Sequence, residues 1–124
     1  MGKDTHMRIL VVDDDEFIRA VCLLILTGAG HEVTVTANGV AAMQRLKSAQ
    51  FDLVLADLEM PLLDGIGLYN AVLNEYPYLT DRFLFITGRL TPANQTVLEG
   101  WNAEYILKPF SVKELLKRVG AFML

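Results

Sequence analysis

The feature that most constrains the fold is a fivefold alternation between short apolar runs and segments of helical length. The apolar runs are RILVV (8–12), EVTVTA (32–37), DLVLAD (52–57), RFLFIT (82–87) and AEYILK (103–108). The segments of helical length are 16–27, 40–48, 66–75, 92–99 and a last one from 112 onward. Strands that alternate with helices are typical of a parallel sheet covered by helices on both faces. We therefore predict an α/β fold of five strand–helix units.

Right-handed crossover connections leave few arrangements for such a chain. The arrangement that fits best is the doubly wound, flavodoxin-like three-layer sandwich with a parallel sheet in the order 2-1-3-4-5. In this order the segment 32–37, which alternates in polarity, lies at an edge of the sheet. No linker, repeat or low-complexity stretch divides 7–124, so we predict one domain there. We expect residues 1–6, MGKDTH, to be a disordered or added tail ahead of a natural start.

Composition excludes several classes of protein. Hydrophobic residues make up 52% of the 124, which predicts a packed core, and the net charge of −4 argues against direct nucleic-acid binding. The single cysteine, Cys22, has apolar neighbours and is expected to be a buried thiol. The apolar segment 20–26 is too short to cross a bilayer, so we expect a cytoplasmic protein without membrane contact. His6 and His31 lack a ligand pattern and are expected at the surface.

Polar side chains stand where the predicted strands end. Asp13 and Asp14 follow the first strand, and Asp57 ends the third. Thr87 ends the fourth strand, and Lys108 ends the fifth. Because ligand sites of open α/β sheets lie beyond the carboxyl ends of the strands, we expect these five side chains to converge.

Three crowded carboxylates repel one another, and one of them would take up a proton unless a cation joined them. Ligands that are all oxygen favour a hard ion, and Mg²⁺ fits best, with Mn²⁺ as the alternative. An aspartate beside such an ion can attack phosphorus and form an aspartyl phosphate. Lys108 would share the charge of the phosphoryl oxygens with the metal, and Thr87 could donate a hydrogen bond to one of them.

Four motifs stand in a characteristic order: ILVVDDDEFIR, DLVLADLEMPLLDG, FLFITG and YILKPF. With them the chain resembles the receiver (response regulator) domains of two-component signalling, over 7–124. The resemblance implies that Asp57 is the phosphoryl acceptor, that Thr87 and Tyr105 form the switch, and that Lys108 binds phosphate. The metal ligands that it implies are Asp14 directly, Asp13 mostly through water, Asp57, and the backbone carbonyl of Glu59. It also favours a cis Lys108–Pro109 peptide bond.

The same resemblance implies a function and partners. A histidine kinase or a histidine phosphotransfer protein would donate the phosphoryl group, as in a phosphorelay. The domain would catalyse its own phosphorylation and dephosphorylation without being a conventional enzyme. Its fourth helix, fifth strand and fifth helix would change on phosphorylation, and a homodimer could form through them. Glu59 and Arg89 lie at the rim of the site, where we expect their charges to pair, hinder water and slow dephosphorylation.

Simpler interpretations exist for several of these residues. The acidic run 13–15 could cap the first helix, and Asp15 is expected to do only that. Thr87 could be an ordinary turn residue, and Tyr105 could serve packing alone. The first helix presents an apolar stripe on its solvent side, which either is an ordinary surface or docks a partner helix. The members of this stripe are Ala20, Leu23, Leu24 and Thr27.

Three other functions compete with the signalling switch. A receiver-like domain could act as a binding module without phosphorylation, although its acids and lysine are intact. An aspartate-nucleophile phosphatase would carry a second aspartate two residues after the nucleophile, where this chain has Glu59. A flavin-binding domain would need a Ser/Thr-rich phosphate loop after the first strand, where this chain has acids.

Overall fold

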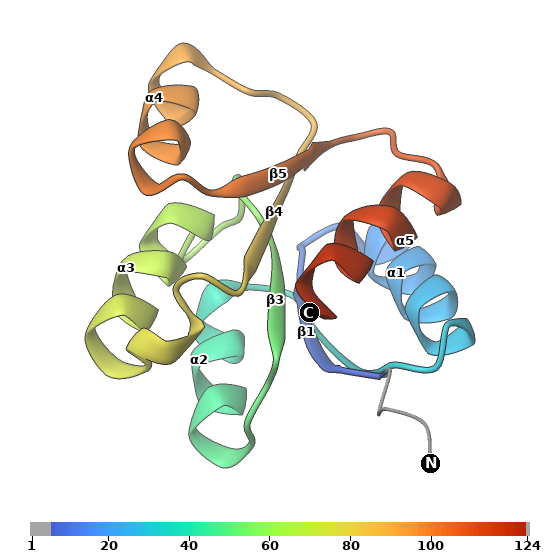
Figure 1. Cartoon of the computed structure of the whole chain (residues 1–124). Coiled ribbons are helices and arrows are strands. Elements are labelled where there is room, and N and C mark those ends of the chain that lie inside the picture. The colour runs from blue at the N-terminus through green and yellow to red at the C-terminus, as the bar shows by residue number, and fades with distance from the viewer. Residues whose placement is uncertain (1–5, 124) are drawn as a thin grey trace.

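The computed structural model describes residues 6–123, which form one five-stranded parallel sheet in the order β2-β1-β3-β4-β5 (Figure 1). The strands are β1 (Arg8–Val12), β2 (Glu32–Thr36), β3 (Leu53–Asp57), β4 (Phe83–Thr87) and β5 (Glu104–Leu107). The helices are α1 (Glu16–Gly28), α2 (Gly39–Ser48), α3 (Gly65–Glu75), α4 (Pro92–Trp101) and α5 (Val112–Gly120). The predicted fold class and strand order are confirmed. The predicted tail at 1–6 lies almost entirely outside the described residues.

Helices cover both faces of the sheet and bury two separate cores (Figure 1). Successive residues of a strand point to opposite faces, so Ile9 and Val11 enter one core while Leu10 and Val12 enter the other. The first core lies beneath α1 and α5, and the second lies beneath α2, α3 and α4. Because the central strands are buried on both faces, their sequences are apolar apart from Arg8, Asp57 and Thr87 at their ends.

Every predicted element end lies within two residues of the observed one, and the largest difference is at the end of α4. This helix reaches Trp101 because the indole ring stacks on Tyr69 of α3, with ring centroids 3.9 Å apart. Asn102 then ends the helix in the left-handed conformation, at a φ of 53°. Two short 3₁₀ helices, η1 (Pro77–Leu79) and η2 (Ala121–Met123), were not predicted.

The expectation that His31 lies at the surface is wrong. This side chain is buried, and its Nδ1 accepts a hydrogen bond of 3.0 Å from the backbone N–H of Met7. The bond joins the residue before β2 to the residue before β1, where the two strands begin side by side. His6 is exposed, as expected, and the thiol of Cys22 is buried.

The sheet register brings the polar strand ends to one edge. Parallel neighbours end at nearly the same level. The last pairs are Val12 with Ala56, Asp57 with Ile86, and Thr87 with Leu107. The residues that follow β1, β3, β4 and β5 therefore surround a common space at the carboxyl edge of the sheet.

Candidate functional site

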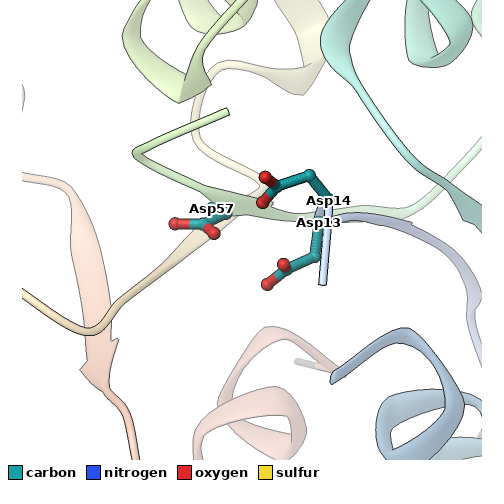
Figure 2. A group of neighbouring side chains, drawn as sticks. All are labelled: Asp13, Asp14 and Asp57. Carbon is teal, nitrogen blue, oxygen red and sulfur yellow. The ribbon is translucent and has the colours of Figure 1, made fainter. Parts of the chain in front are cut away.

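Three aspartates meet where β1 and β3 end (Figure 2). Asp13 and Asp14 follow β1 directly, and Asp57 is the last residue of β3. One carboxylate oxygen from each lies within 4.8 Å of the other two. Asp13 and Asp57 are only 1% and 5% exposed, whereas Asp14 is open to solvent. The structure thus brings together the acids that the sequence placed at separate strand ends.

Lys108, just after β5, places its ammonium between two of these acids. Its Nζ lies 3.0 Å from Asp57 Oδ2, to which it donates a hydrogen bond, and 3.0 Å from Asp13 Oδ2. The second contact is an ion pair that is not aligned as a hydrogen bond, so Asp13 Oδ2 is buried without a hydrogen-bond donor. The Lys108–Pro109 peptide bond is cis.

Burial and charge shift the pKa values of this cluster. Burial raises the pKa of the Asp13 carboxyl and the charge of Asp57 adds to the rise, against the opposing N–H of Asp15 and the ammonium of Lys108. Burial alone would lower the pKa of Lys108, but its contacts with Asp13 and Asp57 raise the value above the ordinary one. One lysine therefore stays charged, yet it does not fully offset three carboxylates.

The donor set fits a divalent cation. All candidate side-chain ligands are carboxylate oxygens, which suit Mg²⁺. Asp13 Oδ2 is buried and pairs with the Lys108 ammonium at 3.0 Å, but it accepts no aligned hydrogen bond, so it can also coordinate a metal ion. The exposure of Asp14 leaves room for the waters that Mg²⁺ keeps. Asp13, Asp14 and Asp57 are thus the residues that would hold the ion.

The loop after β3 is packed tightly against the acceptor strand. A Cβ at Gly65 would stand 2.4 Å from the carbonyl oxygen of Asp57, so this position requires glycine. The N–H of Glu59 donates to Asp57 Oδ1 at 3.1 Å. The expected role of the Glu59 carbonyl as a metal ligand stays a prediction. Leu62, which is 81% exposed at a φ of 71°, is a strained position that the sequence did not reveal.

The two residues expected to form the switch lie on adjacent strands. Thr87 is buried, and its hydroxyl donates to the carbonyl of Arg89 at 2.8 Å and accepts from the Arg89 N–H at 3.1 Å. Tyr105 is half-buried on β5, where it pairs with Phe85 of β4. In this structure the hydroxyl of Thr87 is therefore engaged within its own loop. The switch roles stay predictions.

The two rim residues do not meet. Glu59 and Arg89 are both exposed, and within residues 6–123 no ion pair of 4.0 Å or less joins their side chains. Slow dephosphorylation through such a pair stays a prediction. Sequence reasoning missed Arg19, whose side chain reaches back from α1 to the carbonyl of Asp13. Its place at the end of the motif ILVVDDDEFIR was the only available signal.

Comparison with known proteins identifies the family. Residues 9–120 match the response regulator receiver domain. This chain belongs to that family. The receiver domain is 34% identical to the response regulator receiver protein CpdR of Brucella abortus, over 90% of this chain and 92% of that protein. It is 33% identical to the CAI-1 autoinducer sensor kinase/phosphatase CqsS of Vibrio cholerae, over 99% of this chain and 18% of that protein.

Solved structures share the fold. The chemotaxis response regulator CheY4 of Vibrio cholerae has a TM-score of 0.85 and 29% identity, over 95% of this chain and 99% of that one. The response regulator TrrA of Thermotoga maritima, solved in complex with Mg²⁺-BeF, has a TM-score of 0.79 and 31% identity, over 93% of this chain and 97% of that one. The neighbours thus include a receiver-type fold that holds Mg²⁺.

The relatives differ in how much of their length the receiver domain covers. It spans 18% of CqsS, 24% of the response regulator protein FleR of Pseudomonas aeruginosa and about half of the DNA-binding response regulator MtrA of mycobacteria. The same domain thus occurs in proteins with different remaining parts. Among the described residues, no helix is both long and apolar enough to cross a membrane.

Proposed function

We propose that this receiver domain accepts a phosphoryl group on Asp57 in a Mg²⁺-dependent reaction. The donor is a phosphohistidine of a histidine kinase or a histidine phosphotransfer protein. The observation that carries the proposal is the position of Lys108 Nζ, 3.0 Å from both Asp57 Oδ2 and Asp13 Oδ2, beside the third acid, Asp14. Nucleophile, cation and metal ligands thus share one edge of the sheet.

The reaction is a transfer between two nucleophiles. A carboxylate oxygen of Asp57 attacks phosphorus and forms an O–P bond as the P–N bond to the donor imidazole breaks, and the imidazole nitrogen keeps the electron pair. A Mg²⁺ ion held by Asp13, Asp14 and Asp57 would supply positive charge against the phosphoryl oxygens. Lys108 moves its ammonium from Asp57 Oδ2 to the transferred group. The N–H of Glu59 and the rigid end of β3 hold Asp57 in place meanwhile.

Phosphorylation then acts on the surface of the domain. A phosphoryl group adds negative charge and acceptor oxygens at Asp57. The hydroxyl of Thr87 leaves the carbonyl of Arg89 and turns to one of these oxygens, and Tyr105 follows. This biases the surface of α4, β5 and α5 between two states. We propose the same surface for a homodimer.

Incubation with acetyl phosphate and Mg²⁺, followed by intact-mass measurement, tests the proposal. The parent protein should gain one phosphoryl group, and Asp57→Asn or removal of Mg²⁺ with a chelator should abolish the gain. Asp81→Asn, which changes an exposed acid before β4 at the opposite edge of the sheet, is the matched control and should label like the parent. A parent that stays unlabelled would instead favour a binding module that works without phosphorylation.

A further inference from the structure

The backbone between β1 and α1 is held by several hydrogen bonds to Asp13. The N–H of Asp13 donates to the carbonyl of Thr36 at 3.1 Å, and its Oδ1 accepts from the N–H of Asp15 at 2.9 Å. Its backbone carbonyl accepts from Nη1 of Arg19 at 2.8 Å. The first two partners are backbone groups, one at the end of β2 and one in the same connection. The third is a charged side chain that reaches back from the first turns of α1.

The carbonyl that Arg19 holds belongs to the peptide group between Asp13 and Asp14. Because a peptide group is planar, holding its oxygen restrains the plane and with it the position of the Asp14 Cα, from which the next side chain leaves the backbone. In the part of the chain that the structure describes, no hydrogen bond or ion pair holds the Asp14 carboxylate itself. The position of Asp14 beside Asp13 and Asp57 therefore depends on this peptide group.

We infer that Arg19 is a positioning residue, which holds the Asp14 carboxylate in the acid cluster through the Asp13 carbonyl and so raises the affinity for Mg²⁺. The inference rests on the proposed function, because it concerns the same site. Arg19 acts through the backbone and touches no reacting atom. Outer groups that orient metal ligands typically contribute about 10- to 100-fold to metal affinity.

Removing Arg19 changes the affinity for Mg²⁺ in opposite directions if Arg19 positions Asp14 and if it acts only through its charge. A guanidinium beside three carboxylates repels a divalent cation, so its charge alone weakens Mg²⁺ binding. If charge were its only contribution, removing it would tighten Mg²⁺ binding. If Arg19 positions Asp14, removing it loosens the ligand and weakens binding. The two roles thus predict opposite changes in the dissociation constant.

The test is a Mg²⁺ titration of Arg19→Met, followed through backbone amide NMR shifts of the segment 13–15. Methionine keeps much of the apolar stem and removes both the donors and the charge. We expect the dissociation constant for Mg²⁺ to rise about tenfold. Arg45→Met is the matched control, because Arg45 is exposed on α2 and makes no side-chain hydrogen bond or ion pair within 6–123. It should bind Mg²⁺ like the parent.

If the methionine variant does not fold, Arg19→Leu repeats the titration, because leucine also lacks both the donors and the charge. Unchanged or tighter Mg²⁺ binding in either folded variant would overturn the inference and leave the proposed function standing. A parent protein that binds no Mg²⁺ would overturn both. At saturating Mg²⁺, acetyl phosphate should label the Arg19 variants nearly as well as the parent, because these variants lose affinity for Mg²⁺ and not the reacting groups.

Discussion

A single buried histidine, His31, ties the beginnings of two strands together. Its Nδ1 accepts the N–H of Met7, so the ring must be neutral at that nitrogen. Burial lowers the pKa of His31 below the ordinary 6.5, and the charge of His6 lowers it further. The folded protein therefore resists protonation of this ring more than the unfolded chain does.

The first prediction is a loss of stability in mild acid that depends on His31. As the pH falls through about 6.5, the unfolded chain binds a proton that the folded ring takes up only at lower pH. The free energy of unfolding should therefore decrease from neutral pH towards pH 5. His31→Asn keeps an acceptor near the position of Nδ1 and cannot titrate. Its stability should depend less on pH over this range.

Urea unfolding at a series of pH values measures both proteins. At neutral pH the two should differ by less than about 1 kcal/mol, the typical net contribution of one hydrogen bond, because asparagine can keep this bond. An equally steep pH dependence in His31→Asn would show that other groups, such as His6 or the acid cluster, cause the effect.

Residue-level features were the hardest to predict from the sequence. The burial of His31 left no trace, because one residue between a helix and a strand has no periodicity. The strained φ of Leu62 was equally hidden, since such positions usually carry glycine or asparagine. The cap at Asp15 was predictable, because an acid just before a helix has a local reason to be there.

At the scale of elements, periodicity and caps located all five strands and the five main helices. The topology then placed the acids and Lys108 at one edge, because parallel strands end together. Contacts between exposed charged side chains were not predictable in this way. Glu59 and Arg89 stand on the expected loops, but the backbone does not decide where their ends lie.

The outer face of α1 is a candidate docking surface for the phosphoryl donor. The predicted apolar stripe does face outward. Together with Gly28, its residues line a shallow apolar hollow on the surface. Leu24 is 76% exposed, so a change there should hardly affect folding. We propose that a helix of the phosphohistidine donor lies against this face.

Leu24→Glu should slow phosphotransfer from a histidine kinase or phosphotransfer protein that labels the parent. If placing a carboxylate against an apolar partner helix costs about 1.4 kcal/mol of binding free energy, the rate of transfer falls about tenfold. Labelling by acetyl phosphate, which needs no docking, should be unchanged. Leu73→Glu is the control, because Leu73 is 49% exposed on α3. Equal slowing in the two variants would speak against docking at α1.

At the scale of the whole molecule, β4 and α4 are the elements through which we expect the site to act on a distant surface. Thr87 ends β4, and its hydroxyl forms hydrogen bonds with the backbone N–H and carbonyl of Arg89 in the following turn. The far end of α4 is anchored, because Trp101 stacks on Tyr69 of α3. We therefore expect a change at Thr87 to reach the start of α4 first, while the stacked pair limits how far the end of this helix follows.

The last prediction follows from the hydroxyl of Thr87. Beryllofluoride with Mg²⁺ mimics a phosphoryl group on Asp57 and should draw this hydroxyl away from the Arg89 carbonyl. Amide NMR shifts should then change around Asp57, at 88–90, in α4 and in β5. Thr87→Val has a similar shape without the hydroxyl, so it should show the changes around Asp57 but few in α4 and β5. Thr87→Ser keeps the hydroxyl and should behave like the parent. If Thr87→Val transmitted the full set of shifts to α4 and β5, the signal would have to travel by another route, such as the movement of Lys108 just after β5.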